Sequence, residues 1–254
     1  MLDVSVLIVL GSSLALVAAA VGVSIYLRLG IERSIAWASV RAAVQLTTVG
    51  VLLSLLLESG WDYLLAPLWI VAMVGIAGVV VSRRAGTRAV APAAVLAIGG
   101  STALSLAIVF GFGVLPSEPI QMIVIAGITI GNALPATVVA VDQIMVKMTT
   151  DRPQVEGLLS LGFNARQAAR FVVRESARLA LLPQIERTKI VGLVALPGAM
   201  TGLLLAGVAP IDAVVIQLIV MYLVLGTVAV SATVVAVVTA SNVFTPDQRL
   251  KATF

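Results

Sequence analysis

The sequence predicts an all-α membrane protein with about seven transmembrane helices. Of its 254 residues, 60% are hydrophobic and only 11% are charged, whereas a soluble domain has about 25% charged residues. Apolar runs of about 20 residues, the length that crosses a bilayer as a helix, recur along the chain. The basic residues also fall on one side of the topology that these runs define. Much of this chain therefore has lipid as its solvent.

Seven spans can be placed in order from the apolar runs. They are Val4–Leu27, Ile35–Leu57, Tyr63–Val81, Val90–Phe112, Ile120–Val146, Ile190–Ala206 and Ile211–Ala240. The first is expected to remain as a helix, because its run is too long for a cleaved signal peptide and no basic segment precedes it. Arg28 closes the first span, the pair Arg83 and Arg84 closes the third, and a turn at Leu115–Ser117 follows the fourth.

The last three spans are longer or interrupted. Gly131, Asn132 and Pro135 interrupt the fifth span, and Pro197–Gly198 breaks the sixth. Proline has no backbone N–H and disturbs a helix interior, so both places are expected to depart from regular helix. The seventh span ends before a short polar tail.

Charge orients these spans through the positive-inside rule. All 16 Lys and Arg residues fall on one side of the seven-span topology. The opposite side carries acidic residues alone: Asp3, Glu58, Asp62, Glu118 and Asp212. The N-terminus is therefore predicted outside, and the C-terminus and the polar segment 151–187 in the cytoplasm, with the chain crossing the plasma (inner) membrane. The net charge of +4 is a topology signal, and no nucleic-acid partner is expected.

Composition excludes several kinds of chemistry. The chain has no histidine and no cysteine, which removes disulfides, thiolate and imidazole metal ligands, and catalysis by a serine–histidine pair. No acidic pair lies within the predicted spans, so an intramembrane enzyme would have no groups to work with. The chain is expected to be neither an enzyme nor the holder of a cofactor. A passive membrane anchor is an alternative, but it leaves the interrupted spans without a purpose.

The polar segment Asp151–Arg187 is predicted to form two helices. Asp151 and an early proline begin a short amphipathic helix that runs to Phe163. Asn164 is a good N-cap for a second helix, Ala165–Leu182. This second helix carries an arginine at every fourth position: Arg166, Arg170, Arg174 and Arg178. Such a stripe favours a helix that lies on the anionic inner leaflet.

The short helix resembles the EAA loop of ABC-transporter permeases. Glu156 and Gly162 keep the six-residue spacing of that motif, and Gln167 falls where its glutamine stands. Gly157 departs from the pattern by replacing the first alanine. The resemblance implies that this helix contacts a separate ATPase. The contact residues it implies are Glu156, Gly157, Leu161, Gly162 and Phe163.

Three further motifs extend the resemblance to almost the whole chain. They are Arg41–Gln45, Pro119–Ala133 and the run from Lys189 to Gly202. In this order they are similar to the FetB family of ABC permeases, which is implicated in iron export and resembles plant proteins tied to aluminium tolerance. The resemblance implies one permease domain over residues 1–254, which forms a homodimer and docks a separate ATPase. ATP and Mg would bind that partner, and this chain has no Gly-x-x-x-x-Gly-Lys-Ser/Thr run.

Small-residue pairs four positions apart also occur within the spans. Gly127 with Gly131, and Gly198 with Gly202, allow close approach of helix backbones in lipid. They indicate either packing within one subunit or a dimer seam.

Polar groups and interrupted helices mark a candidate translocation path. Intramembrane polar groups are costly and face the bundle interior, and paired Gly/Pro interruptions point to a transport site. The candidates are Arg41, Gln45, Asn132, Pro135, Asp142, Pro197, Gly198 and Met200. Arg41 either extends to the membrane surface or pairs with Asp142. Asp142, Asn132 and Met200 are the candidate metal ligands, beside the amide oxygen of Gln45 and freed backbone carbonyls, and they would make a weak site.

The leading hypothesis is therefore the membrane subunit of an ABC exporter for iron or another metal ion. An ABC permease for a nucleotide sugar or another small solute is one alternative. A stand-alone secondary transporter is another, and its expected mark is a carboxylate at mid-membrane. Asp142 comes nearest to that position but lies toward the cytoplasmic end.

Overall fold

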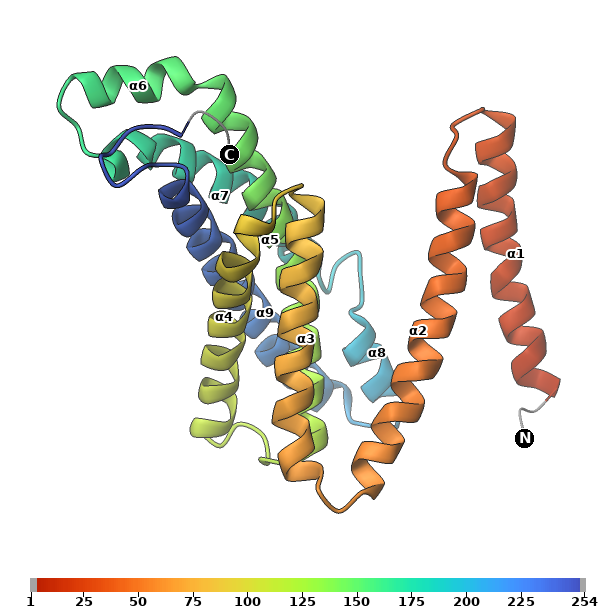
Figure 1. Cartoon of the computed structure of the whole chain (residues 1–254). Helices are drawn as coiled ribbons and strands as arrows, with labels where there is room; N and C mark the ends of the chain where they lie inside the picture. The colour runs from red at the N-terminus through yellow and green to blue at the C-terminus, as the bar shows by residue number, and fades with distance from the viewer. Residues whose placement is uncertain (1–3, 252–254) are drawn as a thin grey trace. The chain divides into compact units, whose positions relative to one another are not determined.

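The structure, a computed structural model, describes residues 4–251 and is helical almost throughout (Figure 1). Asp3, which counts toward the acidic side of the topology, lies outside the described residues. The helices are α1 Val4–Tyr26, α2 Glu32–Glu58, α3 Asp62–Arg84, α4 Ala91–Gly111, α5 Pro119–Thr150, α6 Arg152–Ser160, α7 Ala165–Ile190, α8 Gly198–Leu205 and α9 Pro210–Asn242, with a 3₁₀ turn, η1, at Arg88–Val90. The predicted all-α class is confirmed.

The chain is a multi-pass membrane protein. Five helices of the described region are long and apolar enough to cross a bilayer: α2, α3, α4 with η1, α5 and α9. A shorter apolar helix covers Leu14–Tyr26 within α1. These helices match the predicted spans one to five and seven. The total of seven spans and the orientation stay predictions.

The sixth predicted span, Ile190–Ala206, has a different form in the structure. Only α8 is helical within it after Ile190, and its eight residues rise about 12 Å, too little to cross a hydrocarbon core of about 30 Å. The break is also wider than the predicted Pro197–Gly198 pair. Residues 191–197 form a non-helical connection closed by a bridge between Val191 and Ala195, and Pro197 holds an extended backbone just before α8.

Two other helices continue through proline where the sequence predicted an interruption or an end. The predicted break in the fifth span is wrong, because α5 runs without interruption past Pro135. The predicted end of the second polar-segment helix at Leu182 is also wrong, because α7 continues through Pro183 to Ile190. A proline removes one N–H, and membrane helices tolerate this loss when neighbouring groups satisfy the freed carbonyl.

The helices fall into two units, residues 1–62 and residues 63–254, and the second is called the main unit below. In the first unit α1 packs against α2. In the main unit α9 packs against α4, α5, α7 and α8, and α5 packs against α4, α6 and α7. A buried hydrogen bond between Ser105 and Thr227 joins α4 to α9. The prediction of one permease domain over residues 1–254 stays a prediction.

The main unit has two ends of opposite charge. Its basic end carries Arg83, Arg84 and Arg88 around the turn between α3 and α4, and its acidic end carries Glu118 and Asp212. α5 and α9 have 32 and 33 residues, so each is about 48–50 Å long and exceeds the membrane core. Both helices continue past the membrane core at the basic end, next to α6 and the start of α7 (Figure 1).

The contact between α3 and α4 depends on a glycine. Gly78 is buried on α3, and a Cβ at this position would overlap the Cγ2 atom of Val95 on α4. Small residues of this kind let helix backbones approach closely in lipid, where no hydrophobic force drives helices together. Gly75, one turn earlier on α3, has no atom within 4 Å of its Cβ position.

We predict that Gly78→Val destabilises the protein and Gly75→Val does not. Overpacking at a filled site costs about 1–3 kcal/mol, so the melting temperature of detergent-purified Gly78→Val should fall by several degrees. The check is a thermal unfolding curve of both variants beside the unchanged protein. Equal melting temperatures for the two variants would contradict the α3–α4 contact.

Candidate functional site

Helix α6 presents one face to the interior and the other to solvent. Val155 is fully buried, and Leu158 and Leu159 pack against the core of the main unit. Glu156 and Gly157 lie on the exposed side. The Glu156 carboxylate accepts a hydrogen bond of 2.8 Å from Arg152 Nε, one turn earlier on the same helix. The helix is therefore fixed through its apolar face, and its polar face is free to meet a partner.

The turn after α6 exposes apolar side chains and depends on Gly162. Gly162 has a φ of +89°, a left-handed conformation that glycine adopts without steric cost. On either side of it, Leu161 and Phe163 are 76% and 45% exposed. Exposed apolar side chains at the tip of a protruding turn form a surface suited to a protein contact. The five residues predicted to contact an ATPase therefore lie together along α6 and its C-terminal turn.

Asn164 starts α7 as predicted, and it does so through a complete capping box. The Asn164 side chain accepts a hydrogen bond of 2.9 Å from the Gln167 backbone N–H. The Gln167 side chain in turn accepts one of 3.0 Å from the Asn164 backbone N–H. Asp151 occupies the N-cap position of α6, but its side chain makes no capping hydrogen bond.

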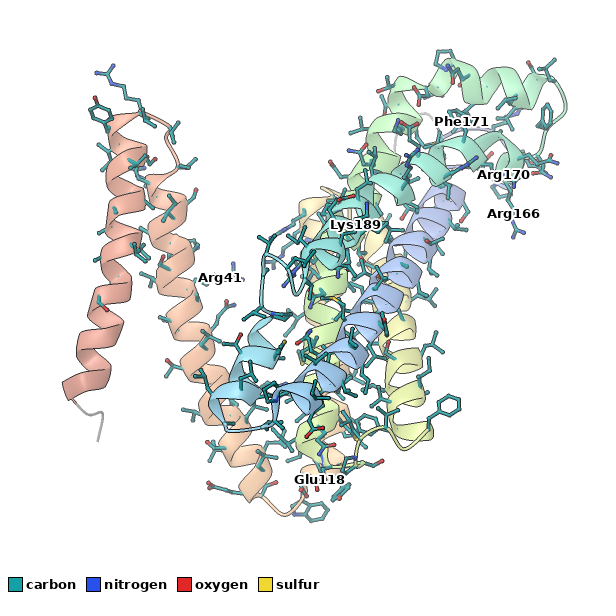
Figure 2. All side chains as sticks on the ribbon, turned by 180° about the vertical axis from the view of Figure 1, so that it is seen from behind. Arg41, Glu118, Arg166, Arg170, Phe171 and Lys189 are labelled. Atoms are coloured by element: carbon teal, nitrogen blue, oxygen red, sulfur yellow. The ribbon has the colours of Figure 1, made fainter. Side chains whose placement is uncertain are left out.

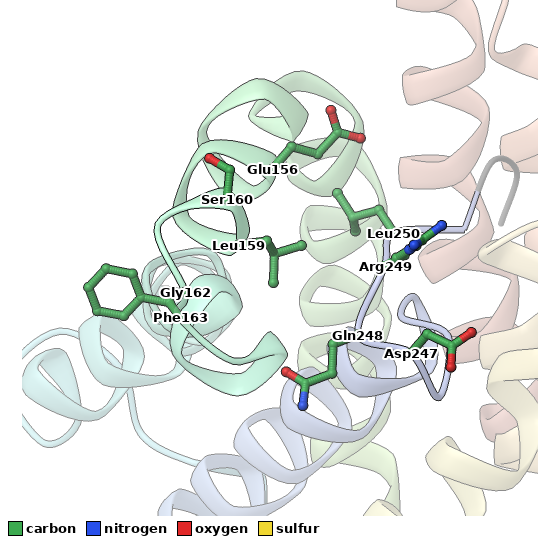
Figure 3. Close-up of a pocket in the computed structure, with 9 residues that line it drawn as sticks. All are labelled: Glu156, Leu159, Ser160, Gly162, Phe163, Asp247, Gln248, Arg249 and Leu250. Atoms are coloured by element: carbon green, nitrogen blue, oxygen red, sulfur yellow. The ribbon is translucent and has the colours of Figure 1, made fainter.

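The segment after α9 forms the second wall of this site (Figure 3). Thr245 N donates to the Arg249 carbonyl at 2.8 Å, which closes a tight loop. Gln248 Oε1 accepts a hydrogen bond of 3.1 Å from the Ala165 backbone N–H, so the loop is attached to the start of α7. Between α6 and this loop lies a groove of about 630 Å³. Its lining residues are Glu156, Leu159, Ser160, Gly162, Phe163 and Asp247–Leu250.

The arginine stripe of α7 lies on the exposed side of the helix. Arg166, Arg170, Arg174 and Arg178 are all exposed. The buried side consists mainly of small residues that pack toward α5 and α9, among them Ala168, Val172 and Ser176. Arg166 and Arg170 lie at the basic end of the main unit (Figure 2). That the stripe lies on the inner leaflet stays a prediction.

The far end of α7 reaches the candidate translocation path. Arg187 Nη1 donates a hydrogen bond of 3.3 Å to Asn132 Oδ1 on α5. Asn132 Nδ2 donates to the Ile128 carbonyl at 2.8 Å, which fixes the orientation of the amide. Two residues after Arg187, Lys189 Nζ pairs with Glu186 Oε1 at 2.8 Å. Arg187 and Lys189 belong to the cytoplasmic charges of the predicted topology, but the structure places Arg187 against Asn132 near the middle of α5.

The remaining predicted path residues are spread over both units. Arg41 and Gln45 are exposed on α2 in the first unit, so the pair between Arg41 and Asp142 stays a prediction. Asp142 is exposed on α5, nearly three turns closer to the basic end than Asn132. The predicted path residues Pro135, Pro197, Gly198 and Met200 lie on α5, at the break and at the start of α8.

Within residues 4–251, no group of three or more acidic, histidine or cysteine side chains is placed to hold a metal ion. The amide oxygen of Asn132, one of the three weak ligand candidates, already accepts a hydrogen bond from the Arg187 cation. A metal site at Asp142, Asn132 and Met200 stays a prediction, and the Arg187 charge works against it.

Sequence reasoning missed two groups of this site: the charged end of α7 and Gln248. The sequence signal for the first was present, because Glu186, Arg187 and Lys189 directly precede the apolar run at Ile190. Gln248 carried no local signal, since its hydrogen-bond partner lies 83 positions away.

Comparisons with known proteins cover nearly the whole chain. A family profile described as "Uncharacterised protein family (UPF0014)" matches residues 7–244. The chain is 31% identical to "Probable iron export permease protein FetB" of Escherichia coli over 247 residues, 96% of this chain and 94% of that protein. It is 38% identical to "UPF0014 membrane protein STAR2" of rice, covering 85% and 76%. It is 33% identical to "Protein ALUMINUM SENSITIVE 3" of Arabidopsis thaliana, covering 87% and 81%. No solved structure matches the chain.

We predict that Asn164→Ala lowers stability and Asn164→Asp preserves it. Loss of an N-cap side chain costs about 0.5–2 kcal/mol, whereas aspartate keeps an oxygen at the same position. Asp151→Ala is the matched control, because Asp151 makes no capping hydrogen bond. The measurement is the thermal midpoint of each purified variant, and an equal loss in Asn164→Ala and Asp151→Ala would contradict the role of the capping box.

Proposed function

The chain belongs to the uncharacterised protein family UPF0014, and we propose that it is the membrane subunit of an ABC transporter driven by a separate ATPase. The observation that carries the proposal is the position of α6. This short helix protrudes beyond the membrane-spanning part of the main unit, with its apolar face buried and its polar face open (Figure 1).

The geometry of α6 supports a role in coupling. α6 follows α5 after Asp151 alone and is joined to α7 by the turn at Gly162. A force on α6 therefore acts on two long helices at once. α5 is unbroken through the membrane, and α7 extends from α6 to the break at residues 191–197. Movement of α6 by an ATPase would tilt both helices and change the passage between the two sides of the membrane.

The relatives support a transporter rather than an enzyme. The Escherichia coli relative is named as a permease, and the others are named as membrane proteins or by an aluminium-sensitive trait. ATP and Mg are proposed to bind in the partner subunit. The groove between α6 and the loop at residues 245–250 is proposed as part of the surface that receives this partner (Figure 3).

A homodimer is proposed because three of the four glycines in the two small-residue pairs present open surfaces. Gly131, Gly198 and Gly202 have no atom within 4 Å of their Cβ positions. An open small-residue surface in lipid allows another helix to approach closely. Gly127 differs from these three, because Met73 lies 3.7 Å from its Cβ position.

The proposed cargo is iron or another metal ion, as the name of the Escherichia coli relative suggests. A nucleotide sugar or another small solute is the alternative within the same ABC mechanism. Outward transport is proposed because the name of the Escherichia coli relative specifies export.

We predict that Glu156→Lys and Gly162→Pro each reduce partner-stimulated ATP hydrolysis. The first reverses the charge of the free face of α6, and the second forces a negative φ on a residue that holds +89°. We expect a loss of about tenfold or more, which corresponds to about 1.4 kcal/mol of interaction with the partner. The measurement is ATPase activity of the reconstituted complex at equal amounts of membrane-inserted permease.

Glu118→Lys is the matched control for the charge reversal, because Glu118 lies at the acidic end of the main unit (Figure 2). It should leave the stimulation unchanged. Unchanged ATPase activity in both α6 variants would remove α6 from the coupling.

The cargo can be tested with the same reconstituted complex. If iron is the cargo, iron added on the side of α6 should stimulate ATP hydrolysis several-fold, because substrate binding favours the state that closes the ATPase. Stimulation by a nucleotide sugar but not by iron would contradict the iron assignment.

A further inference from the structure

Three charged side chains lie at the end of α7, where this helix contacts α5. Lys189 lies at about the height of Arg166 and far from Glu118 at the acidic end (Figure 2). Arg187 is fixed at this level by its hydrogen bond of 3.3 Å to Asn132 on α5. Glu186 forms an ion pair with Lys189. These three residues and Asn132 are called the α7-end cluster below.

Helix geometry gives the depth of the cluster. The Cε methyl at the tip of the Met73 side chain on α3 lies 3.7 Å from the Cβ position of Gly127 on α5, so these two residues lie at similar levels, and both helices run toward the basic end (Figure 1). At about 1.5 Å per residue, Arg84 lies about 16 Å beyond this level and Asn132 about 7 Å beyond it. Asn132 is therefore about 9 Å deeper in the membrane than Arg84, and about 20 Å from Pro119 at the other end of α5.

The cluster is too polar to face lipid. Glu186, Arg187 and Lys189 are all exposed on the main unit. Charged side chains inside the hydrocarbon are costly and occur where they face protein or a water-filled cavity. The cluster also adjoins the non-helical connection 191–197, and irregular backbone at membrane depth is tolerated in the same two environments. Both features indicate that this side of the main unit faces the aqueous path.

The charge of the cluster favours an anion. Arg187 and Lys189 contribute two positive charges against one negative charge from Glu186, which Lys189 already neutralises. Among the residues that the structure describes, Arg187 has only the neutral amide of Asn132 as a hydrogen-bond partner. A guanidinium offers five N–H donors in a planar fork that fits carboxylate or phosphate oxygens. A free metal cation would find the wrong charge here.

We propose that the α7-end cluster is an anion-binding site in the translocation path, with Arg187 as its main ligand and Lys189 as a second cation. This proposal rests on the permease function proposed above and specifies the charge of its cargo. Asn132 orients the Arg187 guanidinium toward the path. The cargo carries carboxylate or phosphate oxygens, and iron passes the site as an anionic complex rather than as a bare ion. The break at residues 191–197 lets the end of α7 move relative to α8, which opens the site toward either side.

The absence of cysteine from the chain allows the site to be probed with single thiols in the full-length protein in membranes. Asn132→Cys would be modified with a negatively charged and a positively charged methanethiosulfonate reagent. The ratio of the two rates is compared with the ratio at Ser160→Cys, an exposed position on α6. We expect the anionic reagent to be favoured on the order of tenfold over this reference, because one fixed charge at close range changes the local concentration of ions by about this factor.

Two variants and one control make the result specific. Arg187→Gln should return the ratio toward the reference, and Arg187→Lys should keep most of the preference. If Arg187→Gln does not accumulate in the membrane, Lys189→Gln provides the same comparison. Ile76→Cys, an exposed apolar position on α3 near the same depth, should react slowly with both reagents. A ratio at or below the reference, or reaction at Asn132→Cys as slow as at Ile76→Cys, would overturn the proposal.

A protection experiment identifies the source of the anion. Asn132→Cys is modified with neutral N-ethylmaleimide in the presence of Fe²⁺ alone, ferric citrate or pyrophosphate. Slowing by ferric citrate indicates an anionic iron complex, and slowing by pyrophosphate indicates a phosphate-bearing solute. The proposed site is overturned if Fe²⁺ alone slows the modification, or if neither ferric citrate nor pyrophosphate slows it.

These measurements need no ATPase, so they can fail separately from the proposed function. A clear anion preference in a protein that no ATPase recognises would keep the site and remove the ABC assignment. Loss of the preference in a complex with normal ATPase coupling would remove only the site.

Discussion

Close packing of α9 against its neighbours holds the main unit together. Its buried positions are largely Ala, Val, Ser and Thr, such as Ala232 and Ser231, with Thr227 hydrogen-bonded to Ser105 of α4. The hydrophobic effect does not drive helices together in lipid. Van der Waals contact between small residues and a few polar contacts must therefore stabilise their association. α9 is also longer than the membrane is thick, and α5 beside it is too. α5 and α9 therefore stabilise the membrane-spanning part of the main unit and also extend beyond it to the region around α6.

α7 connects the region around α6 to the α7-end cluster. This helix starts at its cap on Asn164, close to α6, and ends at Ile190, beyond the contact between Arg187 and Asn132. Lys147 of α5 pairs with Glu175 of α7 at 2.9 Å, so α5 and α7 are joined by polar contacts at two levels. In the proposed coupling, the continuous helix α7 would transmit displacement from the turn at Gly162 to the break after Ile190. The proposed coupling surface and the proposed anion site are thus the two ends of one mechanical element.

Local signals were sufficient for the helical class, most span limits and the start of α7. Apolar run length and flanking charge depend on the neighbouring residues alone, and the Asn164 cap acts on an N–H three residues away. Local signals were insufficient at the prolines. Pro135 and Pro183 were expected to interrupt or follow helices, yet both lie inside continuous helices. Packing of α5 and α7 against α9 outweighs the loss of one backbone hydrogen bond at each proline.

The sequence by itself determined that this chain is a helical membrane protein, and that its polar segment holds two helices separated at Gly162 and Asn164. It also determined the residue types available for chemistry, because the absence of histidine and cysteine is a property of composition. Only the tertiary structure decided that Arg187 lies at the level of Asn132, and that Gln248 meets the start of α7. Those partners are 55 and 83 positions apart in the chain, and hydropathy or spacing within one segment contains no information about such pairs. The depth of a charge in the membrane depends on how far its helix runs, and that length is fixed by packing against the neighbouring helices.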